Sequence, residues 1–302
     1  MPTVALLNAH QTFGDFLESL IFARTVADRM GAKLAAQFNN DRPYKRPLIG
    51  LLQGDKDAVY AGGADLVLDG HKHCDRRFLP GLGKLARLAV PHEHEFDCAG
   101  AVVIHYRDAG YKFRTPMPLR EVDAAYVQPI VTHLYARGER VIRIGHEGMA
   151  PLDGLYMDLS DAPLLKQAYA VSQARLMLEI SPSGPAALAL GYGVPWLRCN
   201  SLVPWGPVET HSVVAMQHVD APSGEVPTQQ FLDLGDVDCR QIHAAGWRWR
   251  KMTPAECIRL ADMMLSRPAP LIEANERPLR FPPIIERRHR VMRWGEGLEM
   301  AA

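Results

Sequence analysis

The sequence predicts an α/β protein with two Rossmann-like domains that face a cleft. Strand and helix patterns alternate between residues 4 and 198, and several strand patterns are apolar throughout, which is typical of buried parallel strands. Polar clusters directly follow these strands, where open parallel sheets bind ligands. We therefore expect an N-terminal Rossmann-like domain over 1–95, a second over 96–270, and a tail over 271–302 that packs across both.

The composition places the chain among ordinary globular proteins and excludes several classes of partner. Hydrophobic residues make up 47% of the 302 positions, and 34 basic residues balance 34 acidic ones. Because the net charge is zero, we expect no nucleic acid partner and no attraction to anionic membranes. An odd number of scattered cysteines, five in all, and no stretch long enough to span a bilayer favour a cytoplasmic protein.

The first third of the chain has the pattern of a β-α-β unit. Strands are expected over 4–9, 33–38 and 64–68, and an amphipathic helix over 15–30. The expected pairing is parallel, because a helical crossover separates the first two strands.

The second half repeats the alternation. Helices are expected over 121–136, over 162–174, from Pro185 onward and over 253–266, with Thr253 as the cap of the last. The expected strands cover 101–106, 140–145, 155–159, 176–180 and 195–198. This order predicts a parallel sheet with helices on both faces.

Three polar residues follow the apolar strand that starts at residue 101: His105, Arg107 and Asp108. We assign all three to a ligand site at the carboxyl end of that strand. The alternatives are an ion pair between Arg107 and Asp108 or Asp161, and a buried, hydrogen-bonded role for His105.

A second strand end carries small polar residues. The strand over 176–180 runs into Ser181, Pro182, Ser183, Gly184 and Pro185, before a helix-like segment. Pro185 suits the first turn of a helix, and Ser183 or Gly184 suits its cap. Free backbone N–H groups at a helix start bind anions, so this turn and Arg107 together predict a phosphate or pyrophosphate site.

The loop between the first strand and the first helix supplies further candidates: His10, Gly14 and Asp15. Such loops bring backbone close to substrates in α/β proteins, and we assign Gly14 to substrate binding. Asp15 and His10 are candidate catalytic bases because both titrate in a useful range. The alternative is that Asp15 or Thr12 only caps the helix.

With these residues in place, the segment from about 100 to 219 resembles bacterial surface-polysaccharide glycosyltransferases of the GT-B type, which are distantly similar to fucosyltransferases. The resemblance rests on His105–Asp108, Tyr126, Arg143–Gly145, Ser160–Asp161, Ser181–Pro185 and Pro195–Asn200. It implies a GT-B-like fold, a cytoplasmic role in polysaccharide biosynthesis, and transfer of a hexose or deoxyhexose. Fucosyltransferases often carry a second arginine where this chain has Asp108.

The resemblance also implies roles for individual residues. Arg107 would neutralise the leaving diphosphate, Ser183 and Gly184 would donate hydrogen bonds to it, and Ser160 or Asp161 would contact the nucleoside. Ser181 and Asn200 belong to the substrate-binding set by the same resemblance. The expected partners are a nucleotide-diphosphate sugar and a glycan or small-molecule acceptor, and we expect no cofactor and no metal.

Other functions and one other site stay open. The fold class also suits a nucleotide-sugar epimerase or hydrolase, and a non-enzymatic ligand-binding or scaffold protein. His71 and His73, together with His92 and His94, could supply the ligands of a zinc ion if a turn brought them together. An exposed polar linker is the alternative for these histidines, because no cysteine spacing here fits a zinc module.

Overall fold

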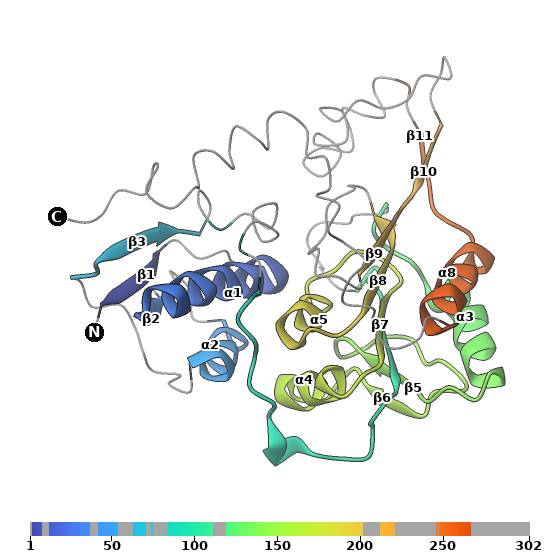
Figure 1. The fold of residues 1–302 in the computed structure, drawn as a ribbon. Coiled ribbons are helices and arrows are strands. Elements are labelled where there is room, and N and C mark those ends of the chain that lie inside the picture. The colour runs from blue at the N-terminus through green and yellow to red at the C-terminus, as the bar shows by residue number, and fades with distance from the viewer. Residues whose placement is uncertain are drawn as a thin grey trace.

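The structure is a computed structural model that describes residues 2–7, 12–36, 42–53, 63–70, 74, 82, 84–110, 119–201, 212–220, 246 and 248–266. It contains two separate parallel sheets with helices packed on them, so the predicted α/β class is confirmed (Figure 1). Within these described ranges, no helix is both long and apolar enough to cross a bilayer.

The first sheet has three parallel strands in the order β2-β1-β3. These are β1 (Thr3–Leu7), β2 (Lys33–Ala36) and β3 (Leu66–Asp69), and the helices of this part are α1 (Phe13–Met30) and α2 (Lys45–Gln53). Helix α1 ends at Gly31, whose φ of 59° lets its N–H bond the carbonyls of Ala27 and Asp28. The central strand is β1, so the loop that follows it leaves from the middle of the sheet.

The second sheet has six parallel strands in the order β6-β5-β4-β7-β8-β9. Their bounds are β4 (Val102–His105), β5 (Val141–Ile144), β6 (Met157–Leu159), β7 (Leu176–Glu179), β8 (Trp196–Ser201) and β9 (Val213–Met216). The chain builds outward from β4 in one direction and then from β7 in the other. The order therefore reverses between β4 and β7, which is the switch point of a doubly wound sheet.

Helices cover both faces of this sheet. Helices α4 (Leu164–Ser172) and α5 (Ala187–Tyr192) lie on one face, and α3 (Ala124–Ala136) and α8 (Pro254–Ser266) lie on the other (Figure 1). A short antiparallel pair, β10 (His218–Asp220) and β11 (Arg248–Arg250), and a 3₁₀ turn over His92–His94 complete the described elements.

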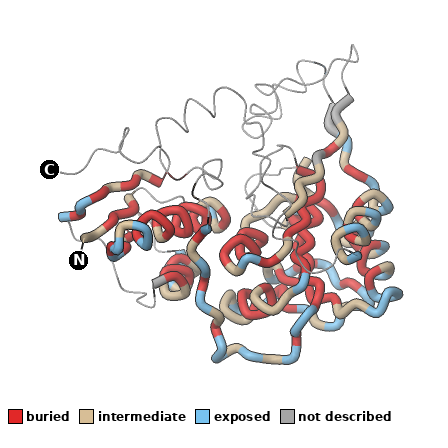
Figure 2. Tube along the Cα trace, viewed as in Figure 1, coloured by how far each residue is buried: buried red, intermediate tan, exposed pale blue. Residues whose placement is uncertain are grey.

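The core of the second sheet follows from strand alternation. Val103 packs with the α4 and α5 side, whereas Val102 and Ile104 pack with the α3 and α8 side. Both sides of β4 are buried, as Figure 2 shows for the central strands, and this explains why its sequence is apolar without interruption.

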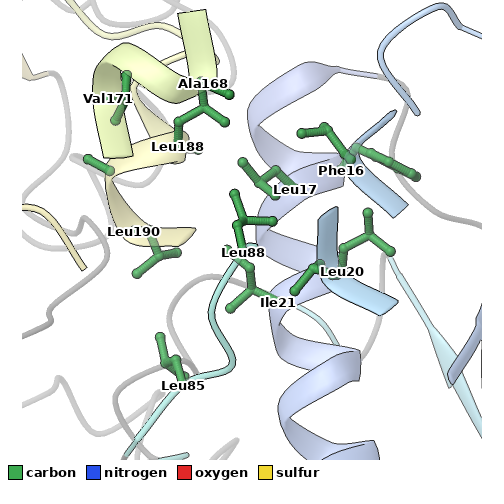
Figure 3. Close-up of a cluster of buried hydrophobic side chains, with 14 of the residues drawn as sticks. Phe16, Leu17, Leu20, Ile21, Leu85, Leu88, Ala168, Val171, Leu188 and Leu190 are labelled. Carbon is green, nitrogen blue, oxygen red and sulfur yellow. The ribbon is translucent and has the colours of Figure 1, made fainter. Parts of the chain in front are cut away.

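One apolar cluster joins the two sheets. Leu17 and Ile21 of α1 face Leu188 of α5, and Leu88 from the connecting segment lies between these helices (Figure 3). All four are at most 5% exposed. A Cβ added at Gly191 would lie 2.4 Å from Leu88, so the absence of a side chain there allows the connecting segment to pack on α5.

Several element boundaries differ from the predictions. The helix expected over 121–136 starts at Ala124, because the Asp123 side chain accepts the N–H of Tyr126 as an N-cap. The predicted cap of α8 is confirmed, since Thr253 and Glu256 bond each other's backbone N–H groups. Helix α2 and the strands β9 and β10 were not predicted.

Candidate active site

The candidate site lies at the carboxyl ends of β4 and β7, where the strand order of the second sheet reverses. His105 ends β4 and stands opposite Glu179, which ends β7; Glu179 in turn stands opposite Arg198 of β8. His105 and Glu179 are completely buried, and Arg198 is 5% exposed. The parallel register thus places three ionisable side chains in one row beneath the edge of the sheet.

The turn after β7 bonds the end of β4 through both of its serines. The Ser181 hydroxyl accepts the backbone N–H of Arg107 at 2.8 Å, which ties the turn to the end of β4. The Ser183 hydroxyl lies 2.6 Å from Nδ1 of His105, and the Ser183 N–H donates to Glu179 at 2.5 Å. The structure therefore brings together four residues that the sequence assigned to the site and adds Glu179.

The expected helix cap at Ser183 or Gly184 is wrong. Helix α5 starts at Ala187, and Ala186 occupies the cap position without a side-chain hydrogen bond. The carbonyl of Gly184 accepts the N–H of Ala187, which forms a tight turn ahead of the helix. Because Glu179 already accepts the Ser183 N–H, that N–H is not available as the expected anion donor.

The first turn of α1, which follows the central strand of the first sheet, reaches the same place. A Cβ added at Gly14 would lie 2.9 Å from Cα of Gly184, so the start of α1 touches the turn after β7. Asp15 is the next residue in α1, is half-buried, and accepts the Thr12 hydroxyl at 2.5 Å. Thr12 stands at the N-cap position of α1 but makes no side-chain cap bond. His10 lies outside the described residues.

The side chain of Arg107 is buried, whereas an anion-binding arginine at the surface would be exposed. Its side chain is 3% exposed, and its Nε lies 4.0 Å from a carboxylate oxygen of Glu121, just before α3. Asp108 does not pair with Arg107: it accepts the N–H of Gly110 and bonds Nε2 of His146 at 2.8 Å. The alternative of an Arg107–Asp108 ion pair is therefore wrong, and Glu121 takes that place.

Ser160 and Asp161 lie at the end of β6, beside a buried arginine. The Ser160 hydroxyl bonds Asp161 at 3.0 Å and Asp158 at 2.8 Å, and Asp158 pairs with Arg143. Burial raises the pKa of the Asp158 carboxyl, but its bonds to Arg143 and Ser160 outweigh this and hold the pKa below its usual range. A contact of Ser160 or Asp161 with a nucleoside stays a prediction.

The side chain of Asn200 forms hydrogen bonds to three other segments of the protein. Its side-chain NH₂ donates to the carbonyl of Ile180 at 2.8 Å and to the Tyr126 hydroxyl at 3.1 Å, and its oxygen accepts the N–H of Met252 at 2.8 Å. The residue is fully buried and has a φ of 55°, a conformation that Asn adopts more readily than most residues. These bonds connect β7, α3 and the start of α8, so the side chain positions structural elements.

A cavity of about 550 Å³ lies next to the segment that follows β4, and its lining includes Tyr106 and Asp108 but not Arg107 or Ser183. Its lining includes Asp108 after β4, Glu121 and Asp123 before α3, and Lys251 before α8. Glu121 is therefore shared: it lines the cavity and approaches the Arg107 guanidinium. The cavity is large enough to belong to the usual range for small-molecule sites.

Burial sets the protonation of His105. The loss of hydration, and next the nearby His146, lower the pKa of His105 to about 3. The ring is therefore neutral at physiological pH and carries a single N–H. The structure matches the alternative in which His105 is buried and hydrogen-bonded, since its ring contacts Ser183 in the turn after β7.

No metal site is seen in the part of the chain that the structure describes. Among those residues, no three His, Cys, Asp or Glu side chains are placed so that they could hold a metal ion. His92 and His94 lie on an exposed or half-exposed 3₁₀ turn, and His71 and His73 lie outside the described ranges. Two Asp-x-Asp sequences, at 55–57 and 236–238, also lie outside them, so metal independence stays a prediction.

Sequence reasoning missed Glu179 and Arg198, although both carried a signal. Each is a charged residue inside an otherwise apolar strand pattern, and charges in fully buried strands are found paired. In the structure they pair with each other, Nε to Oε2, at 2.6 Å.

Comparison with solved structures gives glycosyltransferases. One is the iron-containing dodecameric glycosyltransferase TibC of enterotoxigenic E. coli, with 14% identity, coverage of 88% of this chain and 79% of that chain, and a TM-score of 0.55. Another is a glycosyl transferase family 9 protein of Veillonella parvula, with 12% identity, coverage of 87% and 97%, and a TM-score of 0.50.

TibC, described as a heptosyltransferase, also matches in its complex with ADP-D-β-D-heptose, with 13% identity, coverage of 87% of this chain and 76% of that chain, and a TM-score of 0.52. No protein-family profile and no curated protein matches the sequence. The chain thus has the GT-B-like fold of these glycosyltransferases.

Proposed function

We propose that this protein is a glycosyltransferase that moves a sugar from a nucleotide-diphosphate donor to a hydroxyl acceptor. One observation carries the proposal: the first turn of α1, which follows the central strand of the first sheet, touches the turn after β7 at Gly14 and Gly184. Ligands of doubly wound proteins bind at such points, so a donor held by one sheet lies next to groups from the other. The fold shared with solved glycosyltransferases supports the same conclusion.

The diphosphate is assigned to the ends of β4 and β7. Arg107 offers a positive charge, and its burial strengthens the attraction because the effective dielectric is low there. Ser183 offers a hydroxyl from the turn that contacts Gly14. The donor's sugar or nucleoside would occupy the adjacent cavity, whose lining carboxylates accept hydrogen bonds from hydroxyl groups.

Asp15 is the proposed general base. The acceptor oxygen forms a bond to the anomeric carbon while the bond from that carbon to the phosphate oxygen breaks, and the diphosphate leaves with the electron pair. The acceptor's hydroxyl proton passes to the Asp15 carboxylate. Arg107 stabilises the charge that grows on the leaving group, which is where electrostatic catalysis acts most strongly.

The proposal extends to the sugar and the nucleobase of the donor. TibC was solved with ADP-D-β-D-heptose, and we extend its donor class, an ADP-sugar, to this chain as one candidate. The resemblance to fucosyltransferases gives a fucosyl donor as another candidate, but Asp108, in place of their second arginine, counts against it. A glycan or small-molecule acceptor, a reaction without metal and a cytoplasmic location remain part of the same proposal.

Calorimetric titration with ADP, GDP, UDP and CMP tests the proposal. We expect at least one nucleoside diphosphate to bind below millimolar concentration, and no binding by any of them would refute it. Asp15→Asn should keep this binding but abolish sugar transfer, since the amide cannot accept the proton. Asp28→Asn, an exposed carboxylate on the same helix α1, is the matched control and should transfer normally.

A further inference from the structure

Ser183 is held at two points by the ends of two neighbouring strands. His105 and Glu179 face each other in the register of β4 and β7, and both are completely buried. Nδ1 of His105 lies 2.6 Å from the Ser183 hydroxyl oxygen, and Glu179 accepts the Ser183 N–H at 2.5 Å. The backbone and the side chain of one turn residue are thus fixed together.

Glu179 is itself anchored on the far side. Its second carboxylate oxygen accepts Nε1 of Trp196 at 3.0 Å and Nε of Arg198 at 2.6 Å. The Arg198 guanidinium lies over the Trp196 ring, 4.6 Å from its centre. Because a buried carboxylate without these partners would be costly, Glu179 cannot rotate away, and Ser183 stays in place.

The neutral ring of His105 admits two arrangements of the hydrogen bond to Ser183. In one, the Ser183 O–H donates to Nδ1, so its only proton is used and an arriving anion meets oxygen lone pairs. In the other, Nδ1–H donates to the Ser183 oxygen, and the hydroxyl proton remains for a ligand. Only the second arrangement lets Ser183 recognise an anion.

We infer that His105 and Glu179 are positioning residues that hold Ser183 so that its hydroxyl donates to a phosphate oxygen of the donor, with the His105 proton on Nδ1. The inference rests on the proposed function and names the recognising atom. The Ser183 N–H bonds Glu179, so the side-chain hydroxyl is the group at this residue that can turn to the ligand. His105 and Glu179 act through Ser183 and do not touch the donor.

The tautomer of His105 tests the inference without activity. In protein with ¹⁵N-labelled histidine, long-range ¹H–¹⁵N spectra distinguish the Nδ1–H from the Nε2–H form of each ring. Ser183→Ala removes the hydrogen-bond partner and identifies the His105 signals by their shift. We expect the Nδ1–H form in the wild type, and an Nε2–H form would overturn the inference whatever the protein binds.

A double-mutant cycle tests the role of Glu179. Titration with ADP, GDP and UDP should show that Ser183→Ala weakens binding about tenfold, as expected for one lost hydrogen bond to a charged group, and that Ser183→Thr keeps most of the affinity. Glu179→Gln should weaken binding several-fold with Ser183 present but by less than about twofold in the Ser183→Ala background, because its effect passes through the hydroxyl. An equal loss in both backgrounds would show a merely structural role and overturn the inference.

The matched control is Glu139→Gln. Glu139 also pairs with an arginine, Arg175, in a more exposed ion pair at the opposite edge of the same sheet, and its substitution should leave nucleotide binding unchanged. Failure of the wild type to bind any of the nucleotides would refute the proposed function. Binding that neither Ser183→Ala nor Glu179→Gln alters would overturn this inference alone.

Discussion

Gly14→Ala probes the contact between the two sheets. Gly14 occupies the first turn of α1, and its added Cβ would lie 2.9 Å from Cα and 3.3 Å from the carbonyl oxygen of Gly184. Real Cβ atoms essentially never approach backbone so closely, so one of the two turns must move. The two Gly184 atoms that the Cβ would approach belong to the backbone, so no flexible side chain can absorb the displacement.

Two effects of this substitution oppose each other. Replacing glycine by alanine inside a helix stabilises it by about 0.5–1 kcal/mol, because the unfolded chain loses freedom. Forcing an extra methyl group into a packed contact costs about 1–3 kcal/mol. The contact term is the larger, so we expect the free energy of unfolding to fall by about 1 kcal/mol, accompanied by weaker nucleotide binding at the displaced turn.

Urea denaturation of the wild type and Gly14→Ala measures the net effect. Gly50→Ala serves as control, since Gly50 lies inside helix α2, which packs on α1, and reports the gain in helix propensity. If Gly14→Ala were stabilised relative to the wild type by as much as Gly50→Ala, the close approach of Gly14 and Gly184 would be refuted. The main argument for a site formed by both sheets would then be lost.

Three further predictions concern single side chains. Asn200→Ala should lower the free energy of unfolding by about 3 kcal/mol in urea denaturation, because it leaves Met252 N–H and Ile180 C=O without their side-chain partner at a position with positive φ; a loss below about 1 kcal/mol would contradict its structural role. The pKa of His105 is lowered in the folded protein from its ordinary value of 6.5 to about 3. Below pH 6.5 the unfolded protein therefore binds a proton at this residue more readily than the folded protein does. Stability from this group is complete above that value and is lost as the pH falls toward 3, and the stability–pH curve of His105→Gln should be flatter over this window; parallel curves would disprove the assignment. Arg107→Ala should slow sugar transfer by about 100-fold in an assay of nucleoside diphosphate release, and an unchanged rate would remove Arg107 from the mechanism.

Much of the second sheet could be predicted because its strands are apolar on both faces. The segment that ends at His105 has no polar residue before that histidine, and a parallel sheet buries such a segment completely. The capping box at Thr253 and Glu256 was equally readable, since two side chains of fixed spacing satisfy two N–H groups. Helix α2 was missed, and Pro47 and Gly50 within it are poor helix formers.

The arrangement of the site depends on contacts between distant segments, and these left little trace in local sequence. Ser183 has the composition of a helix cap, but its N–H is taken by Glu179 through the tertiary fold. The approach of Gly14 to Gly184 joins residues that are far apart in the chain, and a single glycine in each turn does not reveal its partner. In the described part of the chain Arg107 pairs with Glu121, whereas the adjacent Asp108 bonds His146 and Gly110.

The apolar cluster between α1 and α5 joins the hydrophobic cores of the two halves. Leu17, Ile21 and Leu188 are completely buried against the other half, and Leu88 fills the space between them. A truncated product that stops before the second sheet would expose this apolar helix face to water and precipitate, so exchange of halves between proteins of this fold requires redesign of that face together with the connecting segment.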